Sequence, residues 1–315
     1  MLNTVYRLVE PRRIESEFSN IDVNGDSVLV RPTHLSICNA DQRYFQGTRP
    51  PEVLKKKLPM ALIHEAIGEV IYDPTGDFKA GQKVVMVPNT PMEEDDIVAE
   101  NYLRSSKFRA SGFDGFMQDI VAMRRDRVVA VPDGIDDYVA AFTELVSVSY
   151  HAIDRFDRKA HGRRNVLGVW GDGNLAFITS LLLKKRFPES KVYIFGKHEY
   201  KMDDFVFADD TFFIDSIPED LRIDHGFECV GKAGSGTSIN QIIDYINPEG
   251  CIAALGVSED PVPINTRMIL EKGLTLYGSS RSSAEDFRHL LQFYKEHPEV
   301  VDYLSSIIGE IVEVR

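Results

Sequence analysis

Short runs of alternating apolar and polar residues dominate the first half of the chain. The clearest cover residues 28–30, 68–72 and 83–87, and turn-forming residues such as Asp73-Pro74-Thr75-Gly76 separate them. A period of two is typical of strands that bury one face. We therefore predict that residues 1–148 form a mostly antiparallel β domain, with a longer polar lobe at residues 89–115.

From about residue 150 the pattern changes to strand-like runs that alternate with segments of helical spacing. The expected strands cover residues 166–170, 191–195, 227–231, 251–257 and 274–277, and the expected helices cover 175–186 and 238–246. Such alternation is typical of a doubly wound parallel sheet covered by helices. The predicted fold class is α/β. Residues 149–285 form the parallel-sheet domain, and residues 286–315 return toward the first domain.

Composition excludes several classes of function. The 315 residues carry 36 Lys+Arg against 49 Asp+Glu, a net charge of -13, so nucleic acid and anionic membranes would be repelled. The three cysteines are too few and too scattered for a secreted disulfide framework, and no N-terminal targeting segment is recognisable. We expect a cytoplasmic protein without membrane insertion, since the apolar runs fall far short of the ~20 residues that span a bilayer.

A glycine-bearing turn follows the first strand of the second domain. Gly171-x-Gly173-x-x-Ala176, with Asn174 and Leu175 between, ends a strand and opens a helix. In that context glycines let a pyrophosphate approach the backbone at a helix N-terminus. The turn predicts a dinucleotide site, although a tight glycine turn that binds nothing would look the same.

The end of the next strand indicates which dinucleotide is bound. Proteins that bind NAD commonly place a carboxylate there, whereas this chain has Lys197, Tyr200 and Lys201. Lysines would pair with a 2'-phosphate, so we expect NADPH. The alternative is that both lysines are simply solvated.

Four residues upstream of the turn can bind a metal ion. They are Cys38, the pair His64-Glu65, and Glu144. Each alone would more often be structural or solvated. Together a thiolate, an imidazole and carboxylates can hold Zn²⁺ and leave one position open, which is the arrangement of a catalytic zinc.

The order and spacing of these segments resemble the zinc-dependent medium-chain dehydrogenase/reductase family. The resemblance implies a GroES-like first domain, a Rossmann second domain and catalytic zinc ligands at Cys38, His64, Glu65 and Glu144. The lobe at residues 89–115 has no cysteine, so only one zinc and no structural zinc is expected. Ala40 replaces the hydroxyl residue that relays a proton in that family. The proton must then travel through water, a substrate hydroxyl or Glu65.

Within that family the chain resembles the ribulose-5-phosphate reductases of wall teichoic acid synthesis, also called ribitol-5-phosphate 2-dehydrogenases. The resemblance lies in five segments, at residues 40–47, 57–65, 111–118, 170–175 and 278–282. It implies reduction of D-ribulose 5-phosphate by NADPH and a ribitol-5-phosphate cytidylyltransferase partner that makes CDP-ribitol. Candidate ligands for the substrate phosphate are Arg43, Arg49, Lys57 and Arg109. Arg281 is a candidate for either substrate or cofactor contact, and we place it with the cofactor residues.

Two other functions remain open. One is a polyol or secondary-alcohol dehydrogenase acting on an unphosphorylated substrate, and the other is a non-catalytic NADPH-binding scaffold for a cytidylyltransferase. A homodimer or a hetero-oligomer is expected. Members of the family continue beyond the position that corresponds to Arg315, so we expect the C-terminal segment to be truncated.

Overall fold

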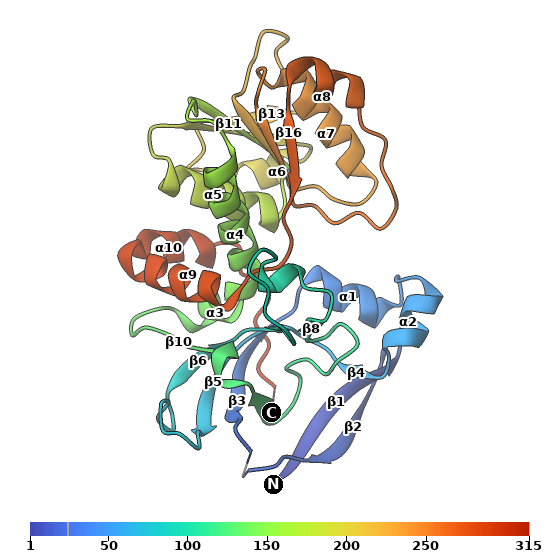
Figure 1. Cartoon of the computed structure of the whole chain (residues 1–315), viewed down its shortest axis with the longest axis vertical. Coiled ribbons are helices and arrows are strands. Elements are labelled where there is room, and N and C mark those ends of the chain that lie inside the picture. Colours follow the sequence, from blue (N-terminus) through green and yellow to red (C-terminus); the bar gives the residue numbers. More distant parts are fainter. Residues whose placement is uncertain (24, 315) are drawn as a thin grey trace. The chain divides into compact units, whose positions relative to one another are not determined.

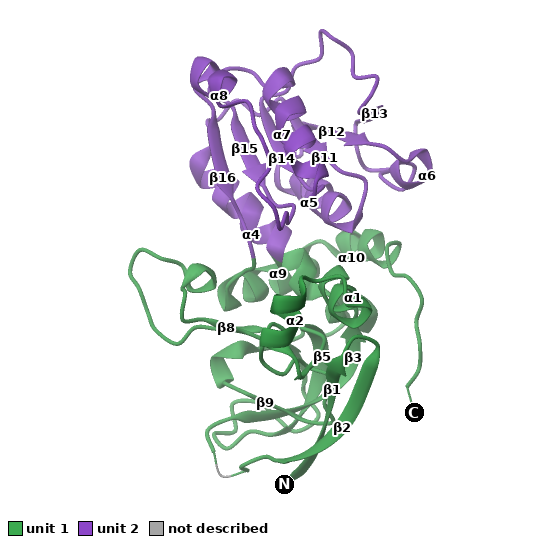
Figure 2. Cartoon of the chain, turned by 90° about the vertical axis from the view of Figure 1, so that its right-hand side faces the viewer, with its two compact units in different colours: residues 1–147, 281–315 green, residues 148–280 purple. Residues whose placement is uncertain are grey.

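The computed structural model describes residues 1–23 and 25–314, which form two compact units (Figure 2). Unit 1 contains Met1–Ser147 and the chain from Arg281 onward, and unit 2 contains Val148–Ser280. These boundaries lie one residue and five residues before those expected from the sequence. Among the described residues, no helix combines the length and apolar character needed to traverse a bilayer.

Unit 1 is built on antiparallel strands, as predicted. Its larger sheet has the strand order β10-β6-β5-β3-β9, and a smaller sheet has the order β2-β1-β4. The expected runs at residues 28–30, 68–72 and 83–87 lie in β3, β5 and β6. The strands of the larger sheet are β3 (Val28–Ser36), β5 (Glu65–Tyr72), β6 (Lys83–Met86), β9 (Val121–Met123) and β10 (Val128–Ala130).

An N-terminal hairpin was not predicted from the sequence. It pairs β1 (Leu2–Glu10) with β2 (Arg13–Asn20), and β4 (Met60–Ala61) pairs with the other edge of β1. Most of β2 is exposed, and Phe18 is 75% exposed. The strand therefore lacks the buried apolar alternation on which sequence-based prediction depends.

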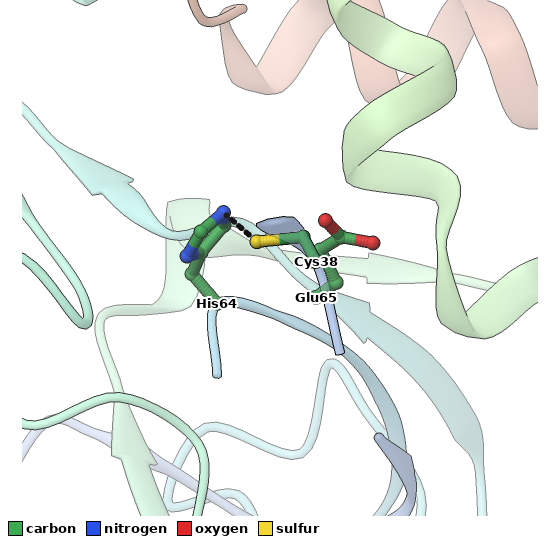
Figure 3. A group of neighbouring side chains, drawn as sticks. All are labelled: Cys38, His64 and Glu65. Atoms are coloured by element: carbon green, nitrogen blue, oxygen red, sulfur yellow. Dashed lines mark hydrogen bonds between the residues drawn. The ribbon is translucent and has the colours of Figure 1, made fainter. Parts of the chain in front are cut away.

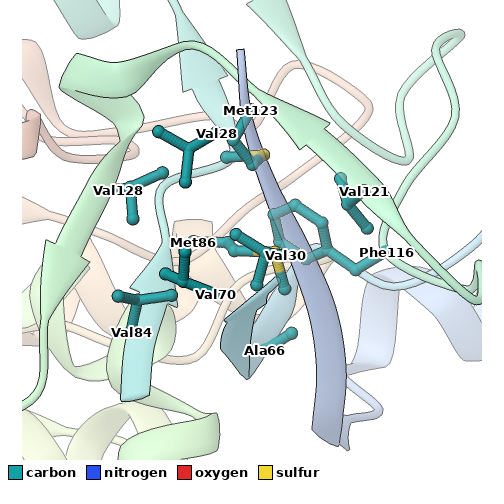
Figure 4. Packing of buried hydrophobic residues seen from close by; sticks show 10 residues of the cluster. All are labelled: Val28, Val30, Ala66, Val70, Val84, Met86, Phe116, Val121, Met123 and Val128. Carbon is teal, nitrogen blue, oxygen red and sulfur yellow. The ribbon is translucent and has the colours of Figure 1, made fainter. Parts of the chain in front are cut away.

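Apolar side chains from five strands pack inside unit 1 (Figure 4). Val30, Ala66 and Val84 come from β3, β5 and β6, and Phe116 closes the cluster without any exposed surface. Burial of such side chains stabilises a fold by roughly 1.5–3 kcal/mol each. This core fixes the two strands, β3 and β5, whose ends carry candidate metal ligands.

Short helices and small strands complete unit 1 (Figure 1). Helix α9 packs against β10, and α10 packs against α9 and α3. The polar lobe contains a two-stranded ribbon, β7 with β8. The remaining elements are α1 (Asn39–Gln46), α2 (Pro51–Lys57), β7 (Asn89–Thr90), η1 (Glu100–Tyr102), β8 (Lys107–Phe108), η2 (Arg125–Arg127), α3 (Asp137–Ala141), α9 (Ala284–Glu296) and α10 (Pro298–Ser305).

Unit 2 is a parallel sheet with the strand order β13-β12-β11-β14-β15-β16, all pairs running parallel. This is the order 3-2-1-4-5-6 of dinucleotide-binding sheets, which confirms the predicted Rossmann architecture. Its strands are β11 (Val166–Trp170), β12 (Lys191–Gly196), β13 (Asp210–Phe213), β14 (His225–Glu228), β15 (Cys251–Ala254) and β16 (Thr275–Gly278). Its helices are α5 (Asn174–Arg186), α6 (Glu199–Met202), α7 (Gly234–Tyr245) and α8 (Thr266–Lys272), and α4 (Thr143–Lys159) crosses the boundary of the units.

Three elements of unit 2 differ by more than one residue from their predicted limits. Strand β14 covers His225–Glu228 rather than residues 227–231. Helix α7 begins at Gly234 rather than at residue 238, and β15 ends at Ala254 rather than at residue 257. The buried Glu228 carboxylate accepts hydrogen bonds from the backbone N–H groups of Val230, Gly231 and Gly256. These bonds draw the chain out of the sheet after both β14 and β15.

His225 of β14 is buried in its neutral form. Its Nε2 donates to the carbonyl of Arg163 (2.9 Å), and its Nδ1 accepts from the backbone N–H of Cys251 (3.0 Å). Protonation of Nδ1 would break the second bond. Burial and the nearby His161 lower the pKa of His225 to about 4.

This pKa shift predicts acid sensitivity between pH 6.5 and pH 4. Above pH 6.5 the imidazole is neutral in both the folded and the unfolded chain, so it contributes nothing. As the pH falls, the unfolded chain takes up the proton first, and the free energy of unfolding drops by up to about 3 kcal/mol. Urea unfolding in EDTA at pH 7.5 and pH 4.5 should show this drop, which His225→Gln should reduce. Equal drops in both proteins would contradict the assignment.

Candidate active site

Cys38 stands at the junction of β3 and α1. It is the N-cap residue of α1, and it is partly buried. The carboxylate of Asp41 accepts from the backbone N–H of Cys38 (3.2 Å) and from its thiol (3.1 Å). The start of α1 thus fixes the direction of the sulfur.

His64 is the last residue of the segment that joins β4 to β5, and Glu65 is the first residue of β5. Figure 3 shows the thiol of Cys38 directed at the imidazole of His64, with 3.5 Å between Sγ and Nε2. The potential ligand atoms of Cys38, His64 and Glu65 all lie within 4.8 Å of one another. Glu144, in the first turn of α4, places Oε2 3.9 Å from His64 Nε2. Three segments far apart in the sequence therefore bring these four side chains together.

Asp41 also links the two segments that carry the thiol and the imidazole. Its second oxygen accepts from the backbone N–H of Ile63 (2.8 Å), one residue before His64. Ile63 has φ 69°, a left-handed conformation that is uncommon for a β-branched residue. Asp41 is buried, and its carboxylate holds this strained backbone beside Cys38.

The site concentrates acidic groups that are costly to ionise without a cation. Burial raises the pKa of the Cys38 thiol, and the charges of Asp41 and Glu65 raise it further. Burial also raises the pKa values of Glu65 and Glu144. Ser36 donates to Glu65 Oε2 (2.9 Å), but Glu65 Oε1 is buried without a hydrogen-bond partner among the described residues. A bound divalent cation would reverse these penalties.

The geometry fits Zn²⁺. Zinc bonds of about 2.3 Å to sulfur and 2.0–2.1 Å to nitrogen, set at a tetrahedral angle, place those two atoms about 3.5 Å apart. The Sγ to Nε2 distance is 3.5 Å. One thiol, one imidazole and buried carboxylates form a donor set suited to a catalytic zinc. Cys38, His64, Glu65 and Glu144 are the residues that would hold it.

The nucleotide turn of unit 2 joins β11 to α5. Gly171 has φ 132°, and its N–H donates to the carbonyl of Phe195 (2.9 Å). A Cβ at this position would lie 3.1 Å from the carbonyl oxygen of Cys229, so the turn requires glycine. Gly173 precedes the helix as its N-cap residue, and a Cβ there would meet nothing within 4 Å. Asn174 and Leu175 form the first turn of α5, whose free N–H groups can receive a phosphate.

A carboxylate that sequence reasoning overlooked organises the adjacent loop. Asp172 Oδ2 accepts from the backbone N–H groups of Lys197 (2.8 Å) and His198 (2.9 Å) and contacts His198 Nδ1 at 2.8 Å. Burial opposes ionisation of Asp172, but these hydrogen bonds outweigh it and lower its pKa. Lys197 and Tyr200 are exposed, and the Lys201 ammonium lies 5.9 Å from the centre of the Tyr200 ring. Three of the expected cofactor residues, Lys197, Tyr200 and Lys201, therefore lie in the segment that follows β12.

The candidate phosphate ligands of unit 1 occupy different environments. Arg109 donates to the carbonyls of Asp114 and Ala122, an arrangement that favours a structural role, and burial lowers its pKa to about 10. Arg49 and Lys57 both lie over the ring of Tyr44, at 4.7 and 5.8 Å from its centre. Lys57 also donates to Ser111 (2.8 Å). Arg43 lies in the last turn of α1.

Arg281 belongs to unit 1 and lies three residues before the first residue of α9. Its guanidinium lies over the ring of Phe108. Burial raises the pKa of Glu144, and the charge of Arg281 offsets part of that rise. Phe108 and Ser36 were not singled out from the sequence, because neither residue type signals a site. Only the folded chain brings them to the ligands.

Comparisons with known proteins agree with this geometry. Residues 24–133 match the alcohol dehydrogenase GroES-like domain, and residues 198–296 match the zinc-binding dehydrogenase domain. Both units therefore contain segments that match domains of zinc-type alcohol dehydrogenases. Its fold and its candidate zinc ligands define the same class.

Individual relatives are more specific. The chain is 59% identical to the ribulose-5-phosphate reductase of Bacillus spizizenii and 57% identical to ribulose-5-phosphate reductase 1 of Staphylococcus aureus. Each alignment covers 100% of this chain and 92% of the relative. The crystal structure of S. aureus TarJ in complex with NADPH superposes with a TM-score of 0.88 at 52% identity, over 98% of this chain and 90% of that one. The chain belongs to the ribulose-5-phosphate reductase group of the zinc-dependent medium-chain dehydrogenase/reductase family.

Proposed function

We propose that this protein reduces D-ribulose 5-phosphate to D-ribitol 5-phosphate with NADPH and one catalytic zinc. The observation that carries the proposal is the 59% identity to a ribulose-5-phosphate reductase across the whole chain. The proximity of Cys38, His64, Glu65 and Glu144 supports their proposed role as metal ligands. The structural neighbour that was solved with NADPH supports the choice of coenzyme.

A zinc ion bound by these residues would polarise the C2 carbonyl as negative charge develops on its oxygen. The chain's own residues set the rest of the chemistry. Asp41 fixes the direction of the thiol and the backbone before His64, and Ser36 orients Glu65. Ala40 has no hydroxyl group, so a proton reaches the product oxygen through water, a substrate hydroxyl or the Glu65 carboxyl group.

The loop after β12 should determine the preference for NADPH. Lys197 and Lys201 can pair with the 2'-phosphate, and each charge-assisted contact is worth roughly 1 kcal/mol or more at a partly exposed site. Replacing both with alanine should lower the ratio of kcat/KM for NADPH to that for NADH at least about tenfold. Lys191→Ala, at the opposite end of β12, is the matched control. An unchanged ratio in the double variant would show that these lysines are only solvated.

One assay tests the proposed reaction. NADPH oxidation should be rapid with D-ribulose 5-phosphate and slow with D-ribulose, and it should depend on bound zinc. Comparable kcat/KM values for the two ketoses, or a preference for an unphosphorylated polyol in the reverse direction, would instead favour a polyol or secondary-alcohol dehydrogenase.

We also propose that the product passes to a ribitol-5-phosphate cytidylyltransferase, which makes CDP-ribitol for wall teichoic acid. The support is the resemblance to reductases of that pathway. Coupling the purified reductase to a cytidylyltransferase with CTP should convert D-ribulose 5-phosphate into CDP-ribitol. Sedimentation of the two proteins together would show whether they form a hetero-oligomer or whether the reductase remains a homodimer.

A further inference from the structure

Arg281 is joined to the metal ligands through an aromatic ring. Its guanidinium carbon lies 4.7 Å from the centre of the Phe108 ring, and that ring lies 5.2 Å from the His64 imidazole, edge to face. The two distances place the guanidinium no more than 9.9 Å from the imidazole centre. In a five-carbon ketose phosphate, five bonds separate C2 from phosphorus, a span of about 6 Å at normal bond lengths. The arginine is therefore within the range of a phosphate whose carbonyl lies at the metal ligands.

The backbone holds Arg281 in a strained conformation. Its φ of 58° is left-handed, which is uncommon for a residue with a long side chain. The following residues are fixed by hydrogen bonds: Ser282 Oγ lies 2.6 Å from Ser147 Oγ, and Ser283 caps α9 together with Asp286. Strain of this kind persists only where surrounding contacts impose it, and it is commonly found at ligand sites.

The guanidinium group makes no ion pair within the described part of the chain. The one carboxylate whose charge acts on it is Glu144, itself a candidate metal ligand, and the Phe108 ring supports its plane. The side chain is half-buried, and burial lowers its pKa. Five N–H donors in a planar fork match the oxygens of a phosphate, and an aromatic ring behind the fork keeps its plane fixed.

Three other basic residues of unit 1 make different contacts. Arg109 donates to two backbone carbonyls, and Lys57 donates to Ser111. Lys107 is exposed and lies 5.4 Å from the centre of the Phe113 ring. Of these residues, only Arg281 lies against a ring that also contacts His64.

We propose that Arg281 binds the phosphate of the substrate and confines the enzyme to phosphorylated ketoses. This inference rests on the proposed function and assigns Arg281 to the substrate rather than to the coenzyme. Phe108 acts as a positioning residue that directs the guanidinium plane.

The test compares Arg281→Met with the wild type. Loss of a bidentate charge-assisted contact should raise the KM for D-ribulose 5-phosphate about 100-fold. The low kcat/KM for unphosphorylated D-ribulose, the Kd for NADPH and the zinc content should stay unchanged. Arg281→Lys keeps the charge without the planar fork and should be intermediate. Arg155→Met is the matched control, because Arg155 also lies over an aromatic ring, that of Tyr277, but in unit 2.

Calorimetric titration with D-ribitol 5-phosphate and with ribitol makes the test independent of turnover. Wild-type protein should bind the phosphate ester more tightly, and Arg281→Met should remove that difference. Equal losses for both ligands would show a structural role and overturn the proposal. Weaker binding of NADPH by Arg281→Met would also overturn it. The same holds if Arg49→Met or Lys57→Met loses the preference for the phosphate ester while Arg281→Met keeps it. If the wild type itself shows no preference for the phosphorylated ketose, the proposed function fails first.

Discussion

Replacing Cys38 with alanine is expected to remove the zinc and to lower kcat for D-ribulose 5-phosphate reduction at least about 1,000-fold. Cys38 supplies the sulfur donor of the cluster, 3.5 Å from His64 Nε2. Stabilisation of developing oxyanion charge by a metal is worth several kcal/mol, and about 1.4 kcal/mol corresponds to a factor of ten in rate. Elemental analysis of the purified variant, combined with a stopped-flow measurement of NADPH oxidation, gives both quantities.

Binding of NADPH should survive this substitution, since the nucleotide turn belongs to unit 2. Fluorescence titration with NADPH checks that the variant is folded. Cys251→Ala, which removes another buried thiol, should keep both zinc and activity. Full turnover by a zinc-free Cys38→Ala protein would refute the role of the metal.

Replacing Gly115 with alanine is expected to disrupt the same site from a distance. A Cβ at position 115 would lie 2.3 Å from the carbonyl oxygens of both Leu62 and Ile63, which are backbone atoms that cannot turn aside. Gly115 also donates its N–H to Ala61 (2.8 Å), so the two segments cannot separate without losing hydrogen bonds. The added methyl group would therefore push away the backbone of Leu62 and Ile63, which directly precedes His64. We expect a loss of about 3 kcal/mol or more in stability, together with weakened zinc binding.

Thermal unfolding with and without added zinc measures both effects. Gly162→Ala is the control, because a Cβ there would meet nothing within 4 Å. If Gly115→Ala unfolded at the wild-type temperature and kept its zinc, the close approach of these backbones would not be essential.

The sequence was sufficient for the architecture wherever burial imposes a periodic pattern. Strands β11 and β12 of unit 2 are mostly buried, so their apolar runs identified them within one residue of their limits. The exposed strand β2 carries no such pattern and was missed. The ends of β14 and β15 depend on hydrogen bonds to Glu228, which arise only after the two strands lie side by side.

The candidate site shows the same division. Thiol, imidazole and carboxylate groups can be recognised in a sequence as potential metal ligands. The structure brings the four predicted side chains close together. Their supporting contacts are not visible in the sequence, because Asp172, Ser36 and Phe108 act through distances set by the fold. Arg281 illustrates the limit: the sequence left both substrate and cofactor contact open for it, and only the fold shows its contact with Phe108, which associates it with the metal ligands.

The zinc X-ray absorption spectrum of the purified wild-type protein tests the metal assignment most directly. One sulfur at about 2.3 Å with nitrogen and oxygen donors at about 2.0–2.1 Å is the expected first shell, at one zinc per chain. A shell with two or more sulfur atoms, or a fully active enzyme that contains no zinc, would contradict the assignment of Cys38, His64 and the neighbouring carboxylates as the catalytic metal site.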